Sequence, residues 1–197
     1  MKRTKKSFIR EEYKKSFDYL KGSKNFIYII TGIFFAFCLI GFLVPAPDFI
    51  SKGIEEIIKN ILTETEGLSI RGLIRFIFFN NLQSSFFGMI FGVLFGILPV
   101  VFAVVNGYLL GFVSSVVVAE EGFFVLWRLL PHGVFELPAI FISLGLGLKF
   151  GTFVFQKNIG ESFREYLWSS LRVFLFVVFP LLIVAAIIEG SLIALTG

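Results

Sequence analysis

Few side chains in this chain could do chemistry, and most of them stand inside long apolar runs. His132 and Glu136 are four residues apart, so they share one face of a helix. An imidazole and a carboxylate placed together can relay a proton or contribute to a metal site. The other polar residues of the apolar runs are Asn80, Asn81, Asn106 and Glu189. Polar groups are costly in apolar surroundings, so we treat these six residues as one candidate polar cluster.

The cluster admits several roles. A metal site is not expected, because Zn²⁺ takes three or four protein ligands and the chain has one His and one Cys, Cys38. No cofactor is predicted either. A proton or ion path would run through Asn106, His132 and Glu136. In a structural role, His132 and Glu136 would bond backbone groups near Pro138 and lock their helix to a turn at Asn106.

The composition requires a membrane. Hydrophobic residues make up 56% of the 197 and charged residues 16%, and there are 28 Phe. An average soluble domain is roughly 45–50% apolar and about 25% charged, so a soluble domain of this size could not hide so much apolar surface. Disorder is excluded because disordered chains are poor in apolar residues. We predict an all-α polytopic transmembrane bundle.

Uncharged runs place the predicted spans. A helix needs about 20 apolar residues to cross the hydrocarbon, and residues 25–47 and 76–119 carry no charge. The five expected spans are about 26–44, 80–98, 101–119, 133–149 and 173–195, after a basic amphipathic segment over 1–25. The second and third spans are expected to turn at Pro99 or at Asn106–Gly107, where breaker residues stand.

Three polar or broken segments complete the predicted bundle. Residues 48–66 and 158–172 have apolar residues at helical spacing and are expected to lie along the membrane interface. Residues 120–130 are too short to span and are expected to be interfacial or re-entrant. The alternative is that residues 120–130 form a sixth span, which would place the C-terminus on the opposite side of the membrane.

Glycines recur at a spacing of four in two predicted spans: Gly88, Gly92 and Gly96 in the second, and Gly107 and Gly111 in the third. Lipid tails are as apolar as Leu, so close backbone contact through small residues is what holds such helices together. The pattern favours packing within one chain, and a tight hairpin or a homo-oligomer seam is the alternative. In each case these spans pack against protein rather than lipid.

Basic residues gather at the N-terminus, where residues 1–24 hold nine bases and three acids. This segment abuts a membrane span, so anionic lipid head groups are its expected partner, and nucleic acid is not. The expected head-group contacts are Lys5, Lys6, Arg10, Lys14 and Lys15. The bias of Lys and Arg between the loops predicts a multi-pass protein of the cell membrane with a cytoplasmic N-terminus.

One stretch carries a family resemblance. Phe79–Asn81 leads into the Gly-rich span, Pro99 and Asn106–Gly107 follow, and Leu130–Ala139 reads LPHGVFELPA. In this order the motifs resemble the stage II sporulation protein M family over about residues 75–150. The resemblance implies a polytopic anchor and scaffold that acts with partner proteins in peptidoglycan remodelling, a partner carrying the hydrolase chemistry. It places the family's motif residues on Asn106, His132 and Glu136, and it carries over no catalytic residue.

Taken together, these features predict a non-enzymatic membrane scaffold that binds other membrane proteins or lipid, with a homo-oligomer as a further expectation. The alternative is a small transporter or channel with its polar path at Asn106, His132 and Glu136. An intramembrane hydrolase is a third hypothesis, for which nothing in the sequence places a serine beside His132. Its candidate nucleophiles are Ser114, Ser115 and Ser143.

Overall fold

The computed structural model describes the backbone of residues 5–196 and, within that range, the side chains of residues 9–126 and 133–193. It is 91% helical, and no strand occurs in the described range. The helices are α1 (Lys5–Lys21), α2 (Lys24–Leu43), α3 (Asp48–Thr65), α4 (Ile70–Ile90), η1 (Phe91–Val93), α5 (Ile97–Glu121), η2 (Phe123–Leu129), α6 (Leu130–Gly151), η3 (Thr152–Phe155), α7 (Ile159–Val173), η4 (Phe174–Val178) and α8 (Phe179–Thr196).

Five helical stretches are long and apolar enough to cross a membrane: Lys24–Leu43, Ile70–Val93, Ile97–Glu121, Gly133–Phe155 and Ile159–Ile193. The predicted all-α polytopic bundle is therefore confirmed. The fifth stretch joins amphipathic α7 to α8 through the π-helical turn η4. At 1.5 Å per residue it is about 50 Å long, more than the ~30 Å of hydrocarbon, so polar α7 extends beyond the apolar layer.

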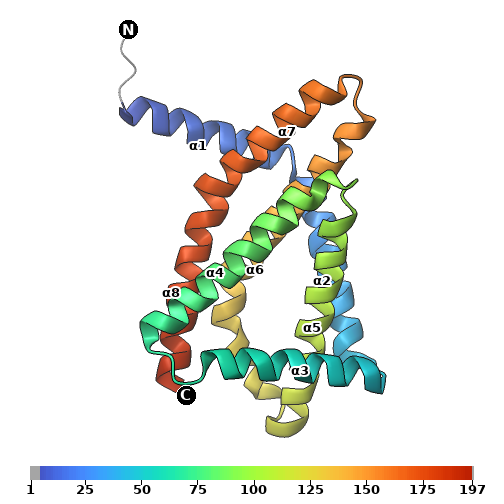
Figure 1. Ribbon diagram of the computed structural model, residues 1–197, viewed down its shortest axis with the longest axis vertical. Helices are drawn as coiled ribbons and strands as arrows, with labels where there is room; N and C mark the ends of the chain where they lie inside the picture. Colours follow the sequence, from blue (N-terminus) through green and yellow to red (C-terminus); the bar gives the residue numbers. More distant parts are fainter. Residues whose placement is uncertain (1–4, 197) are drawn as a thin grey trace.

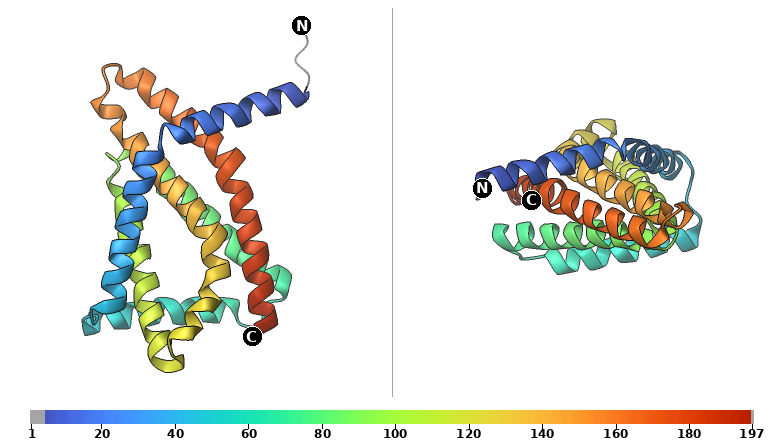
Figure 2. Two further views of the ribbon diagram at one scale, coloured as in Figure 1. Left: turned by 180° about the vertical axis from the view of Figure 1, so that it is seen from behind. Right: turned by 90° about the horizontal axis from the view of Figure 1, so that it is seen from above.

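The spans form two groups joined by α6. Helix α2 packs along α5, whereas α4 packs on α6 and α8, and α6 also contacts α2. In Figure 1 the two groups meet near α7 and diverge toward the opposite end, where α3 crosses between them. The view from behind in Figure 2 shows the same divergence. The polar cluster lies on the helices that diverge.

The glycines set the closest helix contacts. A Cβ added at Gly107 or Gly111 would lie 2.3 Å from the Phe34 carbonyl oxygen or 2.0 Å from that of Cys38, so both glycines seat α5 on α2. Gly92 faces Gly147 of α6 in the same manner, at 2.0 Å from its carbonyl oxygen. These glycines therefore pack within one chain, and the second and third spans pack on different helices instead of forming a tight hairpin.

The second span and its turn differ from the prediction. The predicted span 80–98 is wrong, because α4 begins at Ile70 after Ser69, whose hydroxyl accepts a hydrogen bond from the Gly72 N–H at 3.3 Å. Arg71 and Arg75 belong to this helix, where their long side chains can reach the membrane surface. They were counted outside the span because they are charged.

The chain reverses at residues 94–96, not at Pro99 or Asn106–Gly107. Phe95 and Gly96 have φ of 55° and 71°, the left-handed conformation that ends one helix and starts the next. Pro99 is the third residue of α5, where its missing N–H would have had no partner in the helix. Asn106 and Gly107 lie in the middle of α5, so no turn exists at Asn106 to which α6 could be locked.

The two ends of the bundle carry different interfacial helices. Helices α1 and α7 pack together at one end of the bundle. Helices α3 and η2 lie at the other end, where α8 ends (Figures 1 and 2). The 3₁₀ helix η2 shows Phe124 90% exposed. Its place at the end of the bundle favours the interfacial alternative over the re-entrant one.

A polar joint ties α1 to α7 and α6. Arg172 Nε donates a hydrogen bond to Glu12 Oε2 at 2.6 Å, and Lys15 Nζ donates one to Glu12 Oε1 at 3.0 Å. The Lys15 and Arg172 hydrogen bonds hold the pKa of the Glu12 carboxyl below its usual value although burial opposes them. Lys149 Nζ lies 3.7 Å from the centre of the Tyr19 ring and 3.1 Å from Ser23 Oγ. The interfacial helices at this end are thus held in place.

Candidate functional site

Five of the six residues of the predicted polar cluster line one cavity of about 530 Å³. They come from four helices, with Asn80 and Asn81 on α4, Asn106 on α5, Glu136 on α6 and Glu189 on α8. The sixth, His132, lies outside the residues whose side chains are described. Residues more than a hundred positions apart in the sequence therefore face the same space inside the spanning bundle.

Helix α4 contributes a polar stripe to this cavity. Ser84 and Ser85 also line it, each one turn after Asn80 or Asn81. Asn80 and Ser84 are exposed although they lie near the middle of a spanning helix, because their side of α4 faces the cavity. Neither serine was predicted as part of the site. Their spacing of four from the two asparagines was the signal that could have found them.

The inner end of the cavity lies where α4 meets α6. Ser143 Oγ on α6 donates a hydrogen bond to the Ser85 carbonyl at 2.7 Å, and both residues are buried. The Ser85 side chain is 1% exposed, and its own hydroxyl has no hydrogen-bond partner among the described residues. A buried hydroxyl without a partner is costly, so this position offers a hydrogen-bonding group to whatever occupies the cavity.

Glu136 of α6 and Asn106 of α5 both line the cavity. The Glu136 side chain is only 6% exposed, two residues before Pro138 in α6. Asn106 Nδ2 donates to the Phe102 carbonyl of its own helix at 2.8 Å, which uses one of its amide hydrogens. A deeply buried carboxylate in a spanning helix is rare in membrane proteins and marks a functional site.

The rest of the wall is apolar. It is formed by Leu73, Phe76, Ile77, Phe102, Ile140, Leu144 and Ile193, and α3 adds Ile61, Leu62 and Thr65. No Lys or Arg is among the lining residues in the part of the chain with described side chains. The cavity thus combines two carboxylates, three amides and three hydroxyls with apolar surfaces.

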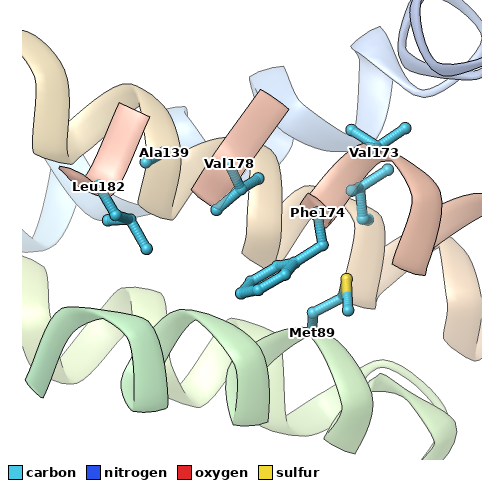
Figure 3. Close-up of a cluster of buried hydrophobic side chains, with 7 residues drawn as sticks. Met89, Ala139, Val173, Phe174, Val178 and Leu182 are labelled. Atoms are coloured by element: carbon cyan, nitrogen blue, oxygen red, sulfur yellow. The ribbon is translucent and has the colours of Figure 1, made fainter. Parts of the chain in front are cut away.

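The cavity is closed toward the α1–α7 end. There α4, α6 and the π-helical turn before α8 pack directly, through the buried cluster in Figure 3. Its members are Met89, Ala139, Leu146, Val173, Phe174, Val178 and Leu182. The Gly92–Gly147 contact adds a second tight crossing. Toward the other end the cavity reaches α3, whose Ile61, Leu62 and Thr65 line it.

The other predicted functions have less support from geometry. Within the described residues no group of three or more His, Cys, Asp or Glu could hold a metal ion. The hydroxyls of Ser115 and Ser143 donate to backbone carbonyls, and none of the three candidate serines lines the cavity. Of the predicted head-group contacts, Arg10, Lys14 and Lys15 are exposed on α1. Lys5 and Lys6 lie outside the described side chains.

Comparison with known proteins points to a family. The model of a family described as Stage II sporulation protein M matches residues 30–192, a range that includes every lining residue of the cavity except Ile193. No curated protein and no solved structure matches the chain.

Proposed function

Since the chain belongs to the stage II sporulation protein M family of membrane proteins, we propose a function for the cavity at the centre of its bundle. The cavity admits a small polar solute or ion from the α3 end and holds it inside the membrane, as the binding step of transport. The observation that carries this proposal is the convergence of five intramembrane polar residues from four helices on one space.

The energetics of the membrane support this reading. Polar side chains in spanning helices usually face a bundle interior or a water-filled space, because exposure to lipid is costly. In this chain they line a cavity large enough for a ligand. A carrier that works by alternating access needs a binding site that is open to one side of the membrane and closed to the other.

The distribution of charge supports an orientation. Residues 1–24 and 149–172, to which α1 and α7 belong, hold nine and four Lys and Arg. Residues 48–75 and 120–130 at the α3 end hold four and one. By the positive-inside rule we assign a cytoplasmic N-terminus in the cell membrane, so the cavity faces the exterior.

Transport is tested in proteoliposomes on a solid-supported membrane, with concentration jumps of a panel of cations, anions and neutral solutes. At least one solute is expected to give a saturable current or uptake that Glu136→Gln abolishes. The matched control is Glu120→Gln, an isosteric change at an exposed residue outside the cavity. Absence of any response to the whole panel by wild-type protein would contradict the proposal.

A second candidate function is the non-enzymatic scaffold, and the family is not a known family of enzymes. The α1–α7 joint favours it, since this joint presents exposed Arg10 and Lys14 beside an ordered helix pair. Such a surface suits anionic lipid or another membrane protein. Affinity purification in mild detergent with mass spectrometry tests it. A stoichiometric partner supports the scaffold, and a homo-oligomer without a partner supports transport.

Glu136→Ala separates the two candidates by stability. If Glu136 only locks the bundle, its removal lowers the melting temperature in detergent. If it serves a ligand, its removal leaves the melting temperature unchanged or raises it while binding is lost, because functional sites are kept at a cost to stability. Both quantities are measured on the same preparation.

A further inference from the structure

We propose that the cavity selects a small organic cation, a protonated amine that carries an apolar body. This inference rests on the proposed binding function and adds the chemical class of the ligand.

The charge of the cavity favours a cation. Glu136 on α6 and Glu189 on α8 both line it, and no Lys or Arg does so among the residues with described side chains. Arg71 and Arg75 of α4 line neighbouring depressions, and the one beside Arg75 shares Phe76 and Asn80 with the cavity. Lys59 of α3 lines a further depression next to the cavity. In surroundings of low dielectric constant, an anion would be repelled by these carboxylates, whereas a cation would gain from both of them.

The hydrogen-bonding groups suit an ammonium group. An ammonium has three N–H donors and no acceptor, so it needs several oxygen acceptors that converge on one point. The carboxylates supply some, and the amides of Asn80, Asn81 and Asn106 supply more. The Ser85 hydroxyl is an independent sign of a ligand, because it is buried at the inner end of the cavity without a hydrogen-bond partner in the described structure.

The size and walls exclude a bare metal ion as the best fit. About 530 Å³ is within the ~300–1,000 Å³ range of pockets for organic ligands and far exceeds one monovalent ion. The rings of Phe76 and Phe102 line the cavity together with aliphatic side chains such as Ile77 and Leu144. Aromatic faces attract organic ammonium groups, and aliphatic walls bury an apolar body, so an amine with a hydrocarbon group uses both features.

Three probes of nearly equal shape isolate the charge: benzylamine as the cation, benzyl alcohol as the neutral compound and benzoate as the anion. Purified full-length protein in nanodiscs is assayed by scintillation proximity with tritiated benzylamine, and empty nanodiscs give the lipid background. We expect saturable binding, displacement by benzyl alcohol at concentrations at least tenfold higher than by benzylamine, and no displacement by benzoate. Equal displacement by the alcohol, or preference for benzoate, overturns the inference.

The role of the carboxylates is tested by Glu136→Gln, which is expected to weaken benzylamine binding at least tenfold, with Glu120→Gln as the unchanged control. If Glu136→Gln fails to fold, Glu189→Gln and the wild-type charge series decide the question. Unchanged benzylamine affinity in a folded Glu136→Gln or Glu189→Gln protein overturns the inference.

A separate experiment distinguishes failure of the ligand class from failure of the cavity. Ser84→Cys in a Cys38→Ser background is exposed to a small membrane-impermeant thiol reagent added from the α3 side. If Ser84→Cys is labelled but benzylamine has no advantage over benzyl alcohol, the cation inference fails and the cavity stands. If Ser84→Cys is not labelled, the proposed function fails as well.

Discussion

Replacing Gly111 by Ala should separate the third span from the first. The added Cβ would lie 2.0 Å from the Cys38 carbonyl oxygen, 2.8 Å from its carbon and 2.9 Å from the Phe42 nitrogen. Ordinary contact begins at 3.4 Å, so α2 and α5 have to move apart by more than an ångström. All three neighbours are backbone atoms, so no change of rotamer can relieve the clash.

The expected cost follows from this geometry. Overpacking of a close interface costs typically about 1–3 kcal/mol, and backbone contact on both sides places Gly111→Ala near the upper end. For a chain of this length 1 kcal/mol corresponds to roughly 2–4 °C in Tm, so Tm is expected to fall by about 6–12 °C. Thermal melting in detergent, followed by tryptophan fluorescence, measures this change.

Gly32→Ala is the matched control. Gly32 is also in a spanning helix, α2, but nothing lies within 4 Å of a Cβ added there. Alanine is the better helix former by about 0.5–1 kcal/mol, so this variant should melt at the wild-type temperature or up to about 4 °C above it. If Gly111→Ala melts within about 1 °C of Gly32→Ala, the close approach does not hold α2 on α5 and the packing argument is refuted.

Three further changes test contacts between the helices. The hydrogen bonds from Lys15 and Arg172 hold the pKa of the Glu12 carboxyl below its usual value. Above the unfolded pKa of about 4.5 the Glu12 carboxylate therefore stabilises the fold. This contribution is lost as the pH falls through the lower pKa of the folded state. Glu12→Gln should therefore lower Tm at pH 7 by an amount that shrinks in acid, as melts across pH would show. Lys149→Met removes the cation over Tyr19 and should speed amide exchange in α1 while the spans keep their protection, which hydrogen–deuterium exchange measures. Ser143→Ala leaves the Ser85 carbonyl without its buried donor and should cost about 1–3 kcal/mol in detergent melts, whereas an unchanged Tm would mean that the bond contributes nothing.

Much of the fold follows from local sequence. Uncharged runs of about 20 residues predict spans because only a helix satisfies its own backbone in lipid. The turn after the second span was misplaced because a proline can either end a helix or occupy its first turn. Pro99 does the latter, and the reversal instead uses Phe95 and Gly96 in the left-handed region.

The candidate site could likewise be predicted only in part from the sequence. The sequence alone identified six polar residues that lipid could not solvate, and the spacing of four relates residues on the same helix, as Asn81 and Ser85 are related. Spacing says nothing about residues on different helices. Asn81 and Glu189 line the same cavity because of the angles at which α4, α6 and α8 cross. These angles depend on the positions where glycine lets two helix backbones come into contact. Composition and periodicity therefore determined which residues had to avoid lipid, and only tertiary packing decided that they share one space.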